Sequence, residues 1–325
     1  HVDCVRLLLE ADATVDLPSS EAVTPLYAAC ERGRTDCAAL LLAANAAVDA
    51  PKKSGFTPLY VACLNSRTEC AQLLLEHNAK VDCAADDGHT PLSIASKHGK
   101  TRCVELVLDA KASVDCCTGS GFTPLYLAGL QGNADIVHRL LEASASVNSQ
   151  SNDGARPPHH PARAPASAAQ PPRRTHALER RRPRLTPTHA PPRLSRACAG
   201  FTPLFAACKG GASDCASLML KAGAQPGLGS KTGLTPLYTA SSNGHSSCVK
   251  LLIDNGAPVD HTTTAGLTPL HIGCSKGTLG CVQQLLGARA AVSLCDGGGS
   301  TPLFKACVAG HGLIASLLVQ SKANL

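Results

Sequence analysis

The stretch Gly55-Phe56-Thr57-Pro58-Leu59-Tyr60-Val61-Ala62 decides the fold, because close copies of it return along the chain at a fixed interval. In residue numbering the interval between neighbouring copies of its Thr-Pro-Leu core is 33 (57 minus 24), except once, where it is 79 (202 minus 123). The recurring threonines are Thr24, Thr57, Thr90, Thr123, Thr202, Thr235, Thr268 and Thr301. A fixed interval of this size is typical of repeat proteins, in which each interval forms one structural unit.

Each repeated unit predicts two helices. Threonine before proline is typical of a helix start, since the hydroxyl accepts a bond from a free backbone N–H and proline needs no donor there. The first helix of a unit is therefore expected to start at Pro25, Pro58 and the equivalent prolines, and to end at a left-handed glycine such as Gly33 or Gly99. The run 36–42 spaces apolar residues three and four apart, which predicts a second, antiparallel helix. A polar hairpin turn, as in 81–88, leads to the next unit.

A helix pair of this size cannot bury its own apolar surface, so the units are expected to stack side by side. The chain of 325 residues has no Trp, four Tyr and five Phe, which suits short helices packed closely through Ala, Leu, Val and Cys. The sequence thus predicts an all-α solenoid of stacked helix-turn-helix units. Its concave face should be lined by the hairpin tips and the first helices.

The motif Gly-x-Thr-Pro-Leu-(Tyr/His/Phe)-x-Ala, seen at 55–62 and in part at 266–271, resembles the ankyrin repeat. This resemblance covers the chain outside one segment, and it implies an ankyrin-type solenoid that binds another protein. The full units are 21–53, 54–86, 87–119, 120–152, 199–231, 232–264 and 265–297, flanked by a partial unit before and a truncated one after. Neither terminal unit has the polar outer face of a capping repeat, so we expect the chain to be a fragment.

Residues 154–199 separate repeats 1–153 from repeats 200–325, and they contain ten Arg, ten Pro and one Glu. Such a composition cannot fold by burial. The net charge of this segment is +9, against −3 for the rest of the chain. Removing the segment restores the regular interval (79 minus 46 gives 33). A Gly154 codon can contain a splice donor, and the codons of Cys198-Ala199-Gly200 can contain a splice acceptor. We favour a retained intron; a disordered insert and an Arg-rich nucleic-acid-binding arm are the alternatives.

No constellation for catalysis, a metal or a cofactor emerges from the sequence, so an enzyme is not expected. Twelve of the seventeen Cys fall in two places of the unit and are interpreted as buried packing residues, and Cys116-Cys117 is expected to be the most exposed thiol pair. The resemblance implies a structural hydrogen-bonding role for His271. The run 227–232 lacks adjacent Gly and Lys and follows no strand, so it does not indicate a phosphate loop.

The sequence predicts a monomeric, non-catalytic scaffold that binds a partner protein through hairpin tips and first-helix ends. Nucleic acid and membranes are not expected as partners. Seventeen Cys could form a disulfide framework, but such frameworks belong to short secreted domains, and the sequence has no secretory signal and no Asn-x-Ser/Thr site. We therefore expect the reducing cytoplasm, or the nucleus. The alternative is the recognition arm of a larger enzyme, such as a kinase or a ubiquitin-ligase receptor. The candidate contact residues are Phe56, Leu64, Asn65, Asp87, His89, Lys97, His98, Phe122, Leu130, Gln131, Phe201, Lys209, Leu234, Leu267 and Lys276.

Overall fold

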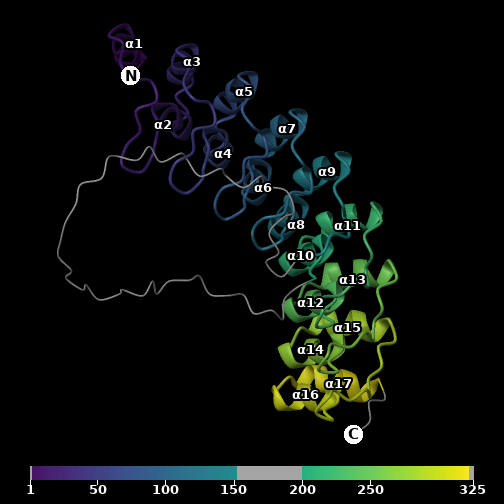
Figure 1. The fold of residues 1–325 in the computed structure, drawn as a ribbon. Coiled ribbons are helices and arrows are strands. Elements are labelled where there is room, and N and C mark those ends of the chain that lie inside the picture. Colours follow the sequence, from purple (N-terminus) through teal and green to yellow (C-terminus); the bar gives the residue numbers. More distant parts are fainter. Residues whose placement is uncertain (1, 152–199, 322–325) are drawn as a thin grey trace, which may run out of the picture.

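The computed structural model describes residues 2–151 and 200–321, and these residues form one curved stack of helix pairs (Figure 1). The first helices of the pairs are α2 (Pro25–Arg32), α4 (Pro58–Leu64), α6 (Pro91–Lys97), α8 (Pro124–Gln131), α10 (Pro203–Gly210), α12 (Pro236–Asn243), α14 (Pro269–Lys276) and α16 (Pro302–Val308). The second helices are α1 (Val2–Glu10), α3 (Thr35–Ala43), α5 (Thr68–Glu76), α7 (Thr101–Asp109), α9 (Ala134–Glu142), α11 (Ser213–Lys221), α13 (Ser246–Asp254), α15 (Leu279–Gly287) and α17 (Gly312–Gln320). The predicted all-α solenoid is confirmed.

The first helices begin where the sequence predicts. The Thr24 hydroxyl oxygen accepts a bond from the Tyr27 backbone N–H at 3.2 Å, and each of the seven later Thr-Pro pairs repeats this cap. Gly33 ends α2 in the left-handed region with φ of 67°. Side chains rarely adopt this conformation, so glycine suits the place. In one unit Ser66 takes the equivalent left-handed place, with φ of 59°.

The two helices of a pair divide the faces of the solenoid between them. Figure 1 shows the even-numbered first helices along the inner side of the arc and the odd-numbered second helices along its outer side. Fully buried residues of successive units, such as Leu59, Leu74, Leu92 and Ala95, form one continuous apolar seam. Small side chains fill most of the seam, which lets the short helices approach closely, and the buried rings within it are those of Tyr27 and Tyr60.

A side-chain oxygen at the start of the hairpin turn ties a unit to the next in six turns of the described chain; it belongs to an Asp in five of them and to Asn148, which accepts the Gln225 backbone N–H at 2.9 Å, in the sixth. The Asp82 carboxylate accepts a bond from the Ser113 backbone N–H at 3.0 Å. The same link joins Asp16 to Ala47, Asp49 to Lys80, Asp115 to Ser146 and Asp260 to Ala291. The series is interrupted at Gly227, whose partner in this register is Pro258. Gly227 offers no side-chain acceptor and proline no donor, so the two departures match.

Stacking continues directly from residue 151 to residue 200. Ser151 donates its backbone N–H to the Phe201 carbonyl at 2.9 Å, and Gly200 donates to the Ser151 carbonyl at 2.9 Å. The preceding unit closes its tip in the same way through Thr118, Gly121 and Phe122. Helix α8 packs on α10, and α9 packs on α11. The predicted segment 154–199 lies outside the described residues, and its flanks meet as the two ends of an ordinary tip turn.

Ten of the twelve periodic Cys residues are buried, as predicted, whereas Cys4 and Cys307 are exposed. These two lie in the first and last units, where the neighbour that would cover each place is missing from the described chain. The expectation for Cys116 and Cys117 is wrong: both are half-buried, and the exposed thiols among the described ones are Cys4, Cys295 and Cys307.

Buried thiols also meet across unit boundaries. Three pairs of thiols shift each other's pKa, and each pair joins neighbouring units rather than the two helices of one unit; they are Cys30 with Cys70, Cys63 with Cys103, and Cys208 with Cys248. The hydrogen bond to Cys103 and then burial raise the pKa of the Cys63 thiol well above its ordinary value. These thiols are free, and their place in the seam gives them a packing role.

Candidate protein-binding surface

The three predicted tip phenylalanines each stack on a ring of their own first helix. The ring centroids are 4.6 Å apart for Phe56 and Tyr60, and the two planes are inclined by 6°. Phe122 stacks on Tyr126 at 4.4 Å, and Phe201 on Phe205 at 4.3 Å. The tip ring is half-buried in all three units, while the helix ring is buried. One face of each tip ring is therefore covered, and the rest of it lies at the inner rim of the solenoid.

The Phe122–Tyr126 ring pair and the Phe201 ring, which lie on opposite sides of the insertion point, join into one apolar cluster. Phe122, Leu130 and Phe201 are half-buried and pack around the buried Tyr126 and Leu127. The cluster thus combines residues of α8, the tip before it and the tip before α10. Three predicted contact residues are brought together here.

A lysine absent from the predicted contact residues caps the first ring pair. The Lys52 ammonium lies 4.9 Å from the centroid of the Phe56 ring and 5.6 Å from that of the Tyr27 ring. A cation over an aromatic face is attracted by the negative face of the ring. Lys52 lies four residues before Phe56 in the same tip, so its place in the turn could have indicated this contact.

The predicted contact residues at the first-helix ends differ in their solvent exposure and in their hydrogen bonds to the rest of the chain. Asn65 donates its side-chain N–H to the Glu31 carbonyl at 3.4 Å, so it joins two units as well as lying at the surface. Leu64 and Lys97 are half-buried; the exposed ones are His98, Gln131, Lys209 and Lys276. These four exposed side chains are open to a partner along the ends of α6, α8, α10 and α14.

Of the remaining tip candidates, Asp87 and His89 lie among polar groups. Asp87 is exposed, and its carboxylate accepts the His89 backbone N–H at 3.0 Å. The His89 ring nitrogen Nδ1 lies 3.0 Å from the Ser93 hydroxyl oxygen. Burial lowers the pKa of His89, and Lys97 and His98 lower it further, against the opposing charge of Asp87. At the other tips Leu234 and Leu267 are half-buried.

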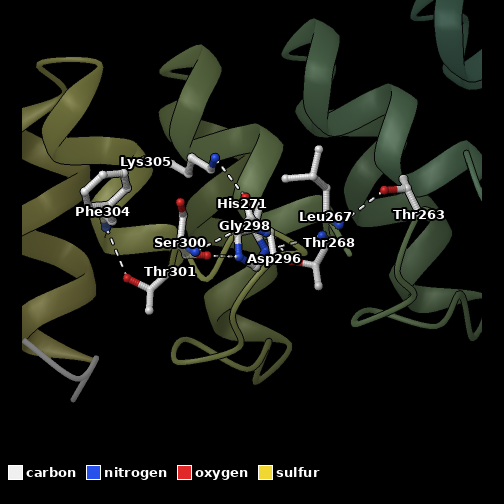
Figure 2. A network of polar contacts seen from close by, with 10 residues as sticks. All are labelled: Thr263, Leu267, Thr268, His271, Asp296, Gly298, Ser300, Thr301, Phe304 and Lys305. Carbon is white, nitrogen blue, oxygen red and sulfur yellow. Dashed lines mark hydrogen bonds and ion pairs between the residues drawn. The ribbon is translucent and has the colours of Figure 1, made fainter. Parts of the chain in front are cut away.

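Near the C-terminal end a polar network holds two tips in register (Figure 2). The buried His271 ring lies with Nδ1 2.8 Å from the Thr268 hydroxyl oxygen and with Nε2 3.1 Å from the Ser300 carbonyl oxygen. Since a carbonyl can only accept, Nε2–H donates to Ser300, and burial lowers the pKa of His271. The structural role that the resemblance implies for His271 is thus visible in its contacts.

Asp296 organises the other side of the same network. Its carboxylate accepts the backbone N–H groups of Gly298 at 2.9 Å and Ser300 at 2.8 Å, and Lys305 approaches it at 2.8 Å. The hydrogen bond from Lys305 is the largest cause, and together with these N–H groups it lowers the pKa of Asp296 to about 2. The network links the unit of His271 to the next unit through the contact of His271 with Ser300 and the ion pair of Lys305 with Asp296.

Within the described ranges, no group of three or more His, Cys, Asp or Glu side chains is arranged to hold a metal ion. No helix of the described chain is long and apolar enough to cross a membrane. The run 227–232 lies in the turn between α11 and α12, with no strand before it.

The family model for ankyrin repeats, which spans three copies of the repeat, matches residues 1–85, 79–151, 184–263 and 247–325. The chain therefore belongs to the ankyrin repeat family. No curated protein matches it with significance. Ankyrin repeats generally mediate contacts between proteins, and the inner rim described above is where this chain presents its half-buried rings and exposed cations.

Proposed function

We propose that this chain is a monomeric, non-catalytic scaffold that binds a partner protein through its hairpin tips and first-helix ends. The observation that carries the proposal is the recurrence of half-buried Phe56, Phe122 and Phe201 at equivalent tips of one rigid stack. Aromatic anchors with cations beside them contribute much of the affinity in protein interfaces. The cytoplasm or the nucleus is the proposed location.

The test compares protein capture by the wild type and two triple variants. Phe56, Phe122 and Phe201 are replaced together by Ser in one variant. The control replaces Leu8, Leu313 and Val319, which are exposed on second helices away from the tips. Far-UV circular dichroism and urea unfolding define conditions in which all three proteins are folded. We expect the tip variant to lose proteins that the wild type and the control both enrich. Equal enrichment by all three proteins would remove the tips from the binding surface.

The second candidate is a recognition arm that delivers substrates to a catalytic region of a larger protein. It uses the same surface, so the capture experiment applies to it unchanged. The full-length transcript separates the two, because only the recognition arm is joined to a catalytic domain.

A further inference from the structure

A row of cations runs across three successive units at the starts of the second helices. Arg34, Arg67 and Lys100 take the same place in their units, directly before α3, α5 and α7. We call these three residues the basic row. Arg32, Lys97 and His98 lie beside it at the ends of α2 and α6. Arg34 and Arg67 are exposed and Lys100 is half-buried, so the row is open to solvent.

The cations of the basic row have no acidic partner in the described chain. Each ion pair found there involves other residues, for example Arg102 with Glu105 at 2.9 Å. Arg67 donates its Nε–H to the Glu31 backbone carbonyl at 3.4 Å, a contact that positions the guanidinium and leaves its charge uncompensated. A ligand can therefore supply the negative end of an ion pair at each of the three places.

The fold does not require cations in these places. Positive charge beside a helix N-terminus opposes the helix dipole, which favours anions there. Later units have Asn133, Ala212 and His245 at the same place and still form their second helices. The basic row thus adds positive potential to three aligned helix N-termini, at some cost in helix stability. A ligand of negative charge would relieve that cost.

Nearby charged residues differ from unit to unit along the basic row. Asp36 and Glu69 lie in the first turns of α3 and α5, two residues after the row, whereas α7 has Arg102 in that position. After burial, Lys97 and Lys100 are the groups that lower the pKa of His98, as expected where positive charge is in excess. Since Arg102 is paired with Glu105, it adds little net charge, but the third unit lacks the acid that flanks the row in the first two units. The flanking acids in the first two units oppose a densely charged ligand.

The spacing of the row selects the shape of the ligand. Packed helices lie about 8–10 Å apart, which sets the step between units. A polyproline II segment has three residues per turn and rises about 3.1 Å per residue, so every third side chain returns to the same side after about 9 Å. A carboxylate at every third residue therefore meets one cation per unit, and arginine can hold it with two parallel bonds.

We propose that the basic row docks an extended, polyproline-like peptide segment of a partner protein that has Asp or Glu at every third residue. This rests on the proposed function, and it names the partner chemistry for the first-helix-end part of that surface. An acidic peptide fits better than nucleic acid, because the repeats themselves have a net charge of −3 and the row is flanked by Asp36 and Glu69.

The experiment measures fluorescence anisotropy of three labelled probes with the full chain. One twelve-residue peptide has Glu at every third position among prolines, a second has the same composition with its glutamates adjacent, and the third probe is a single-stranded oligonucleotide of similar charge. We expect the spaced peptide to bind about fivefold or more tightly than the adjacent one, and its affinity to fall with salt. Charge reversal of Arg34, Arg67 and Lys100 to Glu should weaken it at least about tenfold.

The matched control reverses the exposed Lys80, Lys221 and Lys250, which changes the net charge equally. Circular dichroism checks that both variants fold, and reversal of Arg34 and Lys100 alone replaces the triple variant if Arg67 proves structural. Equal binding of both peptides, equal weakening in the control, tighter binding of the oligonucleotide, or no binding would each overturn the proposal. If the peptides do not bind while protein capture still depends on the tip phenylalanines, the proposed function is retained and the role of the basic row is refuted.

Discussion

Excising residues 154–199 should leave the solenoid intact and make it more stable. In the numbering Gly200 follows Ser151 by 49 (200 minus 151), and after the deletion by 3 (49 minus 46), the separation found in the other tips. The tip bonds between Ser151, Gly200 and Phe201 show that the flanks already meet in this turn. Shortening the loop from about 49 to about 3 residues halves its length about four times. The free-energy cost of closing the loop therefore falls by about 2.5 kcal/mol, which stabilises the folded chain.

The assay is equilibrium urea unfolding followed by circular dichroism, on the full chain and on the variant that joins Asp153 to Gly200. We expect a higher midpoint for the shortened chain, with unchanged helix content. The composition of 154–199, rich in Arg and Pro, gives no reason for it to stabilise the repeats. A shortened chain that unfolds at a lower midpoint, or in two separate steps where the full chain has one, would refute the reasoning. Sequencing the transcript across this boundary tests the retained intron directly.

Three further results are expected. Lys111 has a left-handed φ of 64°, so Lys111→Gly should raise the free energy of unfolding by about 1 kcal/mol. Gly223 has a φ of 88° and open space around it, so Gly223→Ala should lower the free energy of unfolding by a similar amount. The midpoints of urea unfolding check both changes. Asp82→Ala removes the carboxylate that accepts the backbone N–H of the next unit, and it should lower the free energy of unfolding by about 1 kcal/mol. An unchanged free energy of unfolding would refute the stabilising role of this link. The pKa of Asp296 is lowered to about 2 in the folded chain, so the stability that this carboxylate adds is complete above its ordinary pKa and is lost as the pH falls through about 2. Asp296→Asn should therefore remove this part of the loss of stability between about pH 4 and 2. An unchanged dependence of stability on acid pH would contradict the contact with Lys305.

The local parts of the fold were predictable because each depends on residues close in the chain. The cap at Thr24, the proline after it and the left-handed Gly33 act within one helix, so their spacing alone indicates where helices begin and end. Stacking followed from the period, since one helix pair cannot bury its own apolar face. The insertion point was equally predictable, because the period resumes after it and the tip closes through Ser151 and Gly200.

Contacts between units were harder to predict, because they depend on the register of stacking. Cys30 and Cys70 meet across a unit boundary, and their separation in the sequence has no meaning until two units are placed side by side. The exposure of Cys307 likewise depends on the lack of a covering neighbour in the described chain. At the candidate surface, the tip position of Phe56 was predicted, whereas its stacking on Tyr60 and its cation contact with Lys52 depend on side-chain directions.

Hydrogen–deuterium exchange of the chain, alone and with a partner that it captures, tests the binding surface most directly. We expect slower exchange of backbone amides in the tips before α4, α8 and α10 and at the ends of the first helices, with the middle and last turns of the outer second helices unchanged. Protection confined to those turns of α3, α5 and the other second helices would contradict this expectation.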